Sequence, residues 1–133
     1  MEYKHKLELK VRDYECDIQG VVNNSVYQNY LEHARHEFLL ASGINFTELA
    51  KKKINLVVVR AEIDYKSPLQ SGDEFWIGTN VQPASKVRFE FLQDIYRSTG
   101  DKIIVKGKII GTSVNERGRP FVPEEISSLF SAA

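Results

Sequence analysis

The 133-residue chain has few of the features that mark secreted, membrane or nucleic-acid-binding proteins. Its single cysteine, Cys16, excludes a disulfide within the chain and fits a reducing compartment. Eighteen basic residues balance eighteen acidic ones, so no net positive field attracts nucleic acid. The longest apolar stretch, near residues 56–59, is too short to cross a bilayer, and residues 1–10 lack the apolar core of a signal peptide. We therefore expect a soluble, cytoplasmic protein that does not insert into membranes.

Repeats, low-complexity tracts and linkers are also missing from the sequence. Hydrophobic residues make up 42% of the chain and aromatic residues 11%, which is typical of packed globular domains. At this length the chain can bury a core without disulfides or metals. The sequence therefore predicts one folded domain over residues 1–133.

Alternating apolar and polar residues predict that most of the chain is β. Residues 3–11 alternate largely apolar with charged side chains, the period-two pattern of a strand with one buried face. Similar patterns, separated by turns rich in glycine, proline and serine, predict strands over residues 57–65, 75–81, 87–96 and 103–113. The short connections favour antiparallel neighbours, and each outer edge of such a sheet needs a partner copy or protective charges.

After a polar loop over residues 13–24, the apolar period changes to three and four. This spacing predicts an amphipathic helix over residues 25–41, with Ser25 and Gln28 as a capping box and Gly43 as a left-handed end. Shorter helices are expected over residues 46–52, capped by Asn45 or Thr47, and over 124–130. The fold class is therefore α+β, with one long helix packed on a sheet.

Three acidic residues, Asp13, Glu15 and Asp17, are spaced two apart before the long helix. In an extended chain they would face the same way, but other ligands for a cation are missing, so we expect no metal site. Asp17 is the most interesting of the three, because its loop leads to the helix start. Unpaired N–H groups there, near Asn24, Ser25 and Val26, can polarise a carbonyl, and a nearby carboxylate can act as nucleophile or as base towards water.

The loop and helix resemble those of hotdog-fold acyl-CoA thioesterases, and most closely the 4-hydroxybenzoyl-CoA thioesterase group. The resemblance covers nearly the whole chain. It is carried by Asp17, Gly20, Val21, Asn23, Asn24, Tyr27, Tyr30, Leu31, Glu32, Ala34 and Arg35, and then by Tyr65, Pro68, Leu69, Gly72, Asp73, Lys86, Phe89, Ile95, Gly118, Arg119, Pro120 and Pro123.

This resemblance implies a long central helix wrapped by a five-stranded antiparallel sheet, and a homodimer, often paired into a tetramer, with active sites at the dimer interface. It implies hydrolysis of an acyl-CoA or acyl-carrier-protein thioester. Asp17 takes the catalytic role as nucleophile or base, and the backbone N–H near Asn24 polarises the carbonyl. Asn23 and Asn24 either hydrogen-bond the acyl group or shape the loop. No glycine-rich phosphate loop or dinucleotide motif appears, so we expect no cofactor.

The residues that contact the substrate are less sharply indicated. Ser25, Val26 and Tyr27 adjoin the helix start and are candidates for the acyl site. The phosphates of coenzyme A need cations, for which Arg60, Lys86, Arg88 and the lysine run 51–53 compete. Which of these cations bind the phosphates stays open, as does the choice of acyl chain.

Other residues offer alternative chemistry. Glu32 and Glu37 are the second choice for the catalytic acid, because another branch of hotdog thioesterases places its carboxylate on the helix; helix glutamates more often face solvent or form ion pairs. His33 and His36 share a helical face but lack a third zinc ligand. Cys16 is expected to be a small packed residue.

The chain also departs from the family pattern. Val21 and Asn24 stand where many members carry a histidine in the loop, so no general acid for the departing thiolate is evident. Two other functions therefore stay open. A hotdog dehydratase or hydratase would need a histidine paired with an acid in the loop. A non-catalytic module would bind acyl-CoA or acyl-carrier protein without efficient hydrolysis.

Overall fold

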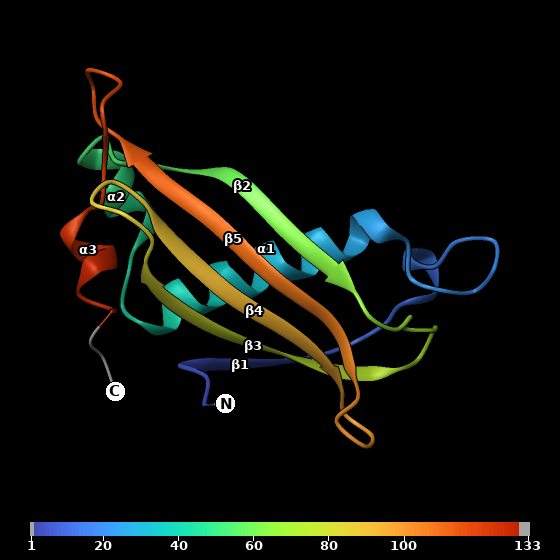
Figure 1. Cartoon of the computed structure of the whole chain (residues 1–133). Helices are drawn as coiled ribbons and strands as arrows, with labels where there is room; N and C mark the ends of the chain where they lie inside the picture. Colours follow the sequence, from blue (N-terminus) through green and yellow to red (C-terminus); the bar gives the residue numbers. More distant parts are fainter. Residues whose placement is uncertain (1, 131–133) are drawn as a thin grey trace.

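A computed structural model describes residues 2–130 of the chain. A long helix lies across one face of an antiparallel sheet, and two short helices lie near one end of it (Figure 1). The elements in chain order are β1 (His5–Lys10), the 3-10 turn η1 (Asp13–Glu15), α1 (Asn24–Ala41), α2 (Phe46–Lys51), β2 (Asn55–Tyr65), β3 (Glu74–Pro83), β4 (Phe89–Arg97), β5 (Ile103–Val114), β6 (Pro120–Phe121) and α3 (Glu124–Ser127).

The sheet has the strand order β1-β3-β4-β5-β2, and every pairing is antiparallel. This confirms the α+β class and the long helix on a five-stranded sheet. The two-residue strand β6, which pairs with the end of β5, was not predicted because two residues carry no periodicity. No helix within residues 2–130 is long and apolar enough to span a membrane.

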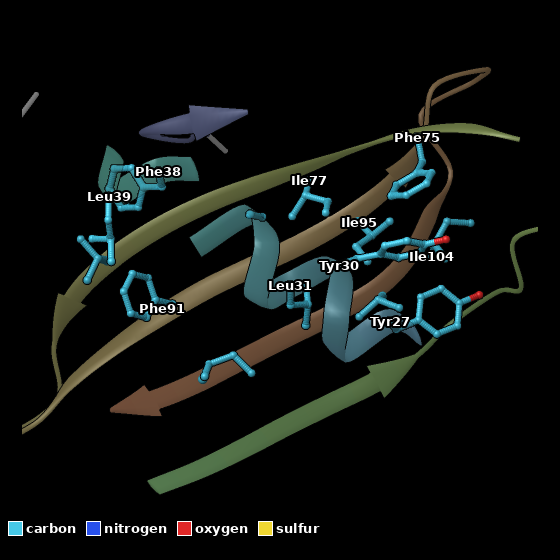
Figure 2. Packing of buried hydrophobic residues seen from close by; sticks show 14 of the residues in the cluster. Tyr27, Tyr30, Leu31, Phe38, Leu39, Phe75, Ile77, Phe91, Ile95 and Ile104 are labelled. Atoms are coloured by element: carbon cyan, nitrogen blue, oxygen red, sulfur yellow. The ribbon is translucent and has the colours of Figure 1, made fainter. Parts of the chain in front are cut away.

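The core lies between α1 and the inner face of the sheet, as Figure 2 shows. Leu31 and Ala34 are fully buried on the helix, and they face a sheet surface that includes Ile77 and Ile95, also fully buried. Polar residues occupy the other side of the helix, so burial follows the predicted three-and-four spacing. This packing fixes how α1 crosses the sheet and therefore where its first turn lies.

The caps of α1 differ in part from the prediction. Asn23, not Ser25, caps the helix, since its Oδ1 accepts hydrogen bonds from the Ser25 N–H (3.1 Å) and the Ser25 hydroxyl (3.1 Å). The predicted capping box of Ser25 and Gln28 is therefore wrong. Gly43 has the expected left-handed conformation, with φ of +87°. At α2 the cap is Asn45, as expected.

Strand β2 departs most from its predicted pattern. Alternation predicted that Val57 and Val59 share a buried face, but these side chains are 39% and 42% exposed. The register with β5 shifts between Val58 and Arg60, which places an extra residue in the strand. Because β2 is an edge strand, it also lacks a neighbour on its outer side within the described part of the chain.

Candidate active site

Asp17 lies in a closed turn between η1 and α1. Its backbone N–H donates to the Val21 carbonyl (2.8 Å), and its carbonyl accepts from the Gly20 N–H (3.0 Å). Gly20 has φ of +82°, a conformation that favours glycine. The Asp17 Oδ1 accepts from the N–H groups of Gln19 (2.8 Å) and Val21 (3.4 Å). The carboxylate is therefore solvent-exposed yet oriented by its own loop.

Backbone hydrogen bonds join the Asp17 turn to the connection between β2 and β3. Val21 pairs with Gln70 in an isolated bridge, and the Val22 N–H donates to the Leu69 carbonyl (2.8 Å). The Leu69 N–H in turn donates to the hydroxyl of Tyr27, which is buried on the first turn of α1 (2.9 Å). Tyr27, a predicted substrate residue, thus ties the helix to the same connection.

The first turn of α1 determines which of the proposed backbone donors are open to a ligand. Of the first-turn N–H groups, that of Ser25 donates to the Asn23 side chain and that of Val26 to the Asn23 carbonyl (2.9 Å). No acceptor for the Asn24 N–H appears among residues 2–130. Of the donors that the sequence proposed, Asn24 is therefore the one available to a ligand. The cap made by Asn23 fits the loop-shaping alternative, and a hydrogen bond from Asn23 to the acyl group stays a prediction.

The neighbouring acids do not form the extended row that their spacing suggested. Asp13 and Glu15 lie in the 3-10 turn η1, where Asp13 accepts from the Ser71 hydroxyl and Glu15 from the Tyr30 hydroxyl (2.8 Å). Over the described part of the chain, no group of histidine, cysteine or acidic side chains could hold a metal ion.

Cys16 is partly buried next to Asp17 and packs against the core. Burial raises the pKa of its thiol, and the nearby carboxylates of Asp13, Asp17 and Glu15 raise it further. Because the thiolate is the reactive form, this environment does not favour a nucleophilic role.

Two of the predicted cations, Lys86 and Arg88, lie away from Asp17 in this chain. Arg60, on the exposed strand β2, forms an ion pair with Glu62 (3.4 Å). Lys86 and Arg88 lie in the β3–β4 connection, at the opposite end of the sheet from the Asp17 loop (Figure 1). The ten residues of β3 separate these two ends by roughly 30 Å. One chain alone therefore does not bring Lys86 or Arg88 to Asp17.

A groove of about 860 Å³ runs along α1 on the side of β2 and reaches α2. Its lining is mostly apolar and includes Leu39, Phe46, Leu49, Ile54, Leu56, Phe89, Phe91 and Ile109. Glu32, the alternative catalytic acid, lines this groove, where its carboxylate lies 3.9 Å from His36 Nε2. Glu37 is not among the lining residues.

Arg35, which lines the groove, belongs to a polar pair that sequence reasoning missed. Arg35 donates through Nη1 to Oε1 of the fully buried Gln93 (3.0 Å), whose amide donates to the Leu31 carbonyl (3.0 Å) and to Thr79 (3.2 Å). Burial lowers the pKa of Arg35, and no carboxylate in residues 2–130 lies within ion-pair distance of it. The sequence offered one signal of this pair: Gln93 is a polar residue at a position where the alternation of Phe91 and Ile95 predicts an apolar one.

Comparisons with known proteins place this chain in a family. The model of the family described as "Thioesterase-like superfamily" matches residues 11–130. The acyl-acyl carrier protein thioesterase ATL3 of Arabidopsis thaliana is 40% identical over 127 residues, which cover 95% of this chain and 67% of that protein. The long-chain acyl-CoA thioesterase FadM of Escherichia coli is 35% identical over 75 residues, 56% of each chain.

A solved structure shows the same fold. Slr0204, a 1,4-dihydroxy-2-naphthoyl-CoA thioesterase from Synechocystis, superposes with a TM-score of 0.86 at 19% identity and covers 93% of each chain. The helix wrapped by the antiparallel sheet is thus a hotdog fold, as the sequence predicted. With a family model matching nearly the whole chain and a 40% identical relative, this chain belongs to the thioesterase-like superfamily and is a thioester hydrolase.

Proposed function

We propose that this chain hydrolyses an acyl-CoA or acyl-carrier-protein thioester, and that Asp17 carries the chemistry. The observation behind this proposal is the exposed Asp17 carboxylate, oriented by two backbone N–H groups in the loop that leads to α1. The unclaimed N–H of Asn24 at the helix start is the donor for the thioester carbonyl oxygen.

Two routes are open to the Asp17 carboxylate. As a base, it removes a proton from water while the water oxygen adds to the carbonyl carbon; the C–S bond then breaks, and the thiolate leaves and gains a proton. As a nucleophile, it displaces the thiolate and forms an anhydride, which water hydrolyses to the free acid and regenerates Asp17. A thiol has a pKa near 8.5, so its thiolate can leave without a loop histidine as general acid.

The apolar groove along α1 is the proposed site for the acyl chain. It begins beside Gln28 in the first turns of the helix and extends past Leu39 to Leu49 in α2. Such a lining suits a hydrocarbon chain, and the named activities of ATL3 and FadM are on acyl-carrier-protein and long-chain acyl-CoA substrates. Both carriers are therefore included as substrates to be tested.

We also propose a homodimer that forms through β2. This edge strand exposes Val57, Val58 and Val59, whereas the other edge strand, β1, exposes Lys6 and Glu8. Charged side chains protect an edge from pairing, and an apolar edge invites it. A two-fold axis beside β2 would make the two copies antiparallel. The β3–β4 connection of the partner, which contains Lys86, would then lie at the same end of the joined sheet as the Asp17 loop of this chain.

The test is release of free thiol from short, long and aromatic acyl-CoAs and from acyl-carrier proteins. We expect the wild type to turn over at least one ester, and Asp17→Asn to lose at least about 100-fold in kcat. Glu32→Gln is the matched control, because it neutralises the alternative acid in the groove.

Loss of activity in Glu32→Gln but not in Asp17→Asn would overturn the role of Asp17. No turnover on any ester, with acyl-CoA binding intact, would favour the non-catalytic binding module.

A further inference from the structure

A buried tyrosine–carboxylate pair joins the Asp17 loop to α1. The Tyr30 hydroxyl donates to Glu15 Oε1 at 2.8 Å; Tyr30 is 6% exposed, and the Glu15 side chain is 11% exposed. The same Oε1 accepts from the backbone N–H of Arg12 (2.8 Å). The carboxylate is thus held from the helix on one side and from the chain before η1 on the other.

Glu15 also contacts the helix start through its backbone. Its carbonyl accepts from the N–H of Asn23 (3.1 Å), the residue that caps α1. Glu15 therefore bonds to both the cap and the second turn of the helix, and Asp17 follows it by two residues. A shift of Glu15 would move Asp17 relative to the Asn24 N–H.

Packing alone does not require this pair. The Tyr30 ring lies against Phe75, with ring centroids 4.8 Å apart, and against Tyr27 at 6.1 Å. A phenylalanine would make the same ring contacts, but the Glu15 carboxylate would then keep only the backbone N–H of Arg12 (2.8 Å) and the Arg12 guanidinium (4.0 Å) as partners. Burying a carboxylate is costly unless it is hydrogen-bonded, so the pair contributes something other than core volume.

We propose that Glu15 and Tyr30 are positioning residues, which set Asp17 at a fixed place relative to the first turn of α1. The proposal rests on the function proposed for Asp17, but it concerns how the loop is held and not which group reacts. Since small displacements of a reacting group cost much of the rate, losing the pair lowers kcat more than it changes KM.

The chain contains a matched control. Tyr3 donates to Oδ2 of Asp94 at 2.6 Å, a second tyrosine–carboxylate pair, and its hydroxyl also lies within hydrogen-bond distance of the Tyr96 hydroxyl (2.8 Å). Asp94 alternates with the inward-facing Gln93 and Ile95, so this pair lies on the outer face of the sheet, away from α1. Tyr3→Phe removes one hydroxyl from a tyrosine–carboxylate pair, as Tyr30→Phe does, without touching the loop; Tyr3 is partly buried.

We expect both tyrosine variants to lower Tm by roughly 5–10 °C, but only Tyr30→Phe to lower kcat, by about tenfold, with KM changed less than about twofold. Glu15→Gln keeps an acceptor for the hydroxyl and should retain most of kcat, whereas Glu15→Ala should match Tyr30→Phe. The double variant Glu15→Ala/Tyr30→Phe should be no slower than either single variant, because both changes break one contact.

Amide hydrogen exchange provides a readout that does not depend on activity. The N–H groups of Gln19 and Val21 bond to the Asp17 side chain, so they report on the order of the loop. Their exchange should be faster in Tyr30→Phe than in the wild type and unchanged in Tyr3→Phe. This holds even if the wild type hydrolyses none of the esters, in which case only the proposed function fails.

The opposite result is equally clear. If Asp17→Asn is inactive while Tyr30→Phe keeps the kcat and loop exchange of Tyr3→Phe, the positioning role is refuted and the function of Asp17 stands.

Discussion

At the scale of single residues, two tyrosines that donate to carboxylates make the stability of the chain depend on alkaline pH. Burial raises the pKa of both Tyr3 and Tyr30, and their hydrogen bonds to the carboxylates of Asp94 and Glu15 raise it further. In the unfolded chain a tyrosine loses its proton near pH 10, whereas the folded chain keeps both protons there. Above pH 10 the unfolded state therefore binds fewer protons, and the free energy of unfolding falls as pH rises.

We expect the urea midpoint to fall more steeply between pH 10 and 11 in the wild type than in the double variant Tyr3→Phe/Tyr30→Phe. Between pH 8 and 9 the two proteins should show the same slope, because neither tyrosine ionises there in either state. Equal slopes above pH 10 would show that the hydroxyls are not protected in the folded protein.

Residue types alone indicated the Asp17 loop as a candidate site but did not indicate the Arg35–Gln93 pair. Asp17 stood out because it precedes a predicted helix start. Arg35 and Gln93 did not, because an arginine on a helix is usually solvent-facing, and the interruption of an apolar register by one glutamine is a weak signal. Their pairing depends on the crossing of α1 over β4, which spacing does not reveal.

At the scale of elements, periodicity predicted the helix and the main strands, and local contacts decided their ends. Asn23 and Ser25 are both good capping residues, so the sequence alone could not choose between them; the bond from the Ser25 N–H to Asn23 does. The alternating residues of β2 do form a strand, but Val57 and Val59 are not buried as the alternation predicted, because the strand has a bulge after Val58 and lies at the edge of the sheet.

The cap of α1 is expected to serve both stability and activity. Asn23→Ala should cost about 1 kcal/mol of unfolding free energy and should also lower kcat, because it loosens the turn that presents the Asn24 N–H. Asn23→Ser, which restores a capping oxygen, should recover both. The measurements are urea unfolding and thioester turnover.

A second asparagine cap provides the comparison. Asn45 caps α2 by accepting from the N–H groups of Thr47 (2.8 Å) and Glu48 (3.3 Å), at the opposite end of α1 from the Asp17 loop. Asn45→Ala should lose similar stability and keep kcat. An equal loss of kcat in both variants would mean that the effect of Asn23 is only a general loss of stability.

At the scale of the whole molecule, the arrangement separates Asp17, the proposed catalytic residue, from two of the candidate cations. The Asp17 loop lies at one end of α1, and Lys86 and Arg88 lie at the other end of the sheet (Figure 1). A ligand such as acyl-CoA carries its thioester and its phosphates on one molecule, so Asp17 and the cations that bind the phosphates must both lie within reach of it. Two antiparallel copies joined at β2 would bring them together, which is why the proposed dimer matters for the proposed reaction.

Substituting Val58 tests this dimer. Its side chain is 54% exposed on β2, and Val58→Lys would place two like charges at a two-fold interface there. We expect the wild type to sediment as a dimer and Val58→Lys to dissociate at a concentration at least about tenfold higher, with thioester turnover per chain falling as monomer accumulates.

Val87→Lys is the matched control, since Val87 is also exposed (37%) but lies outside β2, in the β3–β4 connection. Val87→Lys should leave the sedimenting species a dimer at the same concentrations as the wild type. A wild type that is monomeric yet fully active, or a Val58→Lys variant with an unaltered dimer, would contradict pairing through β2. In the first case the cations that bind the carrier would have to come from the same chain as Asp17, and Arg60, at the centre of β2, would then be the first to test.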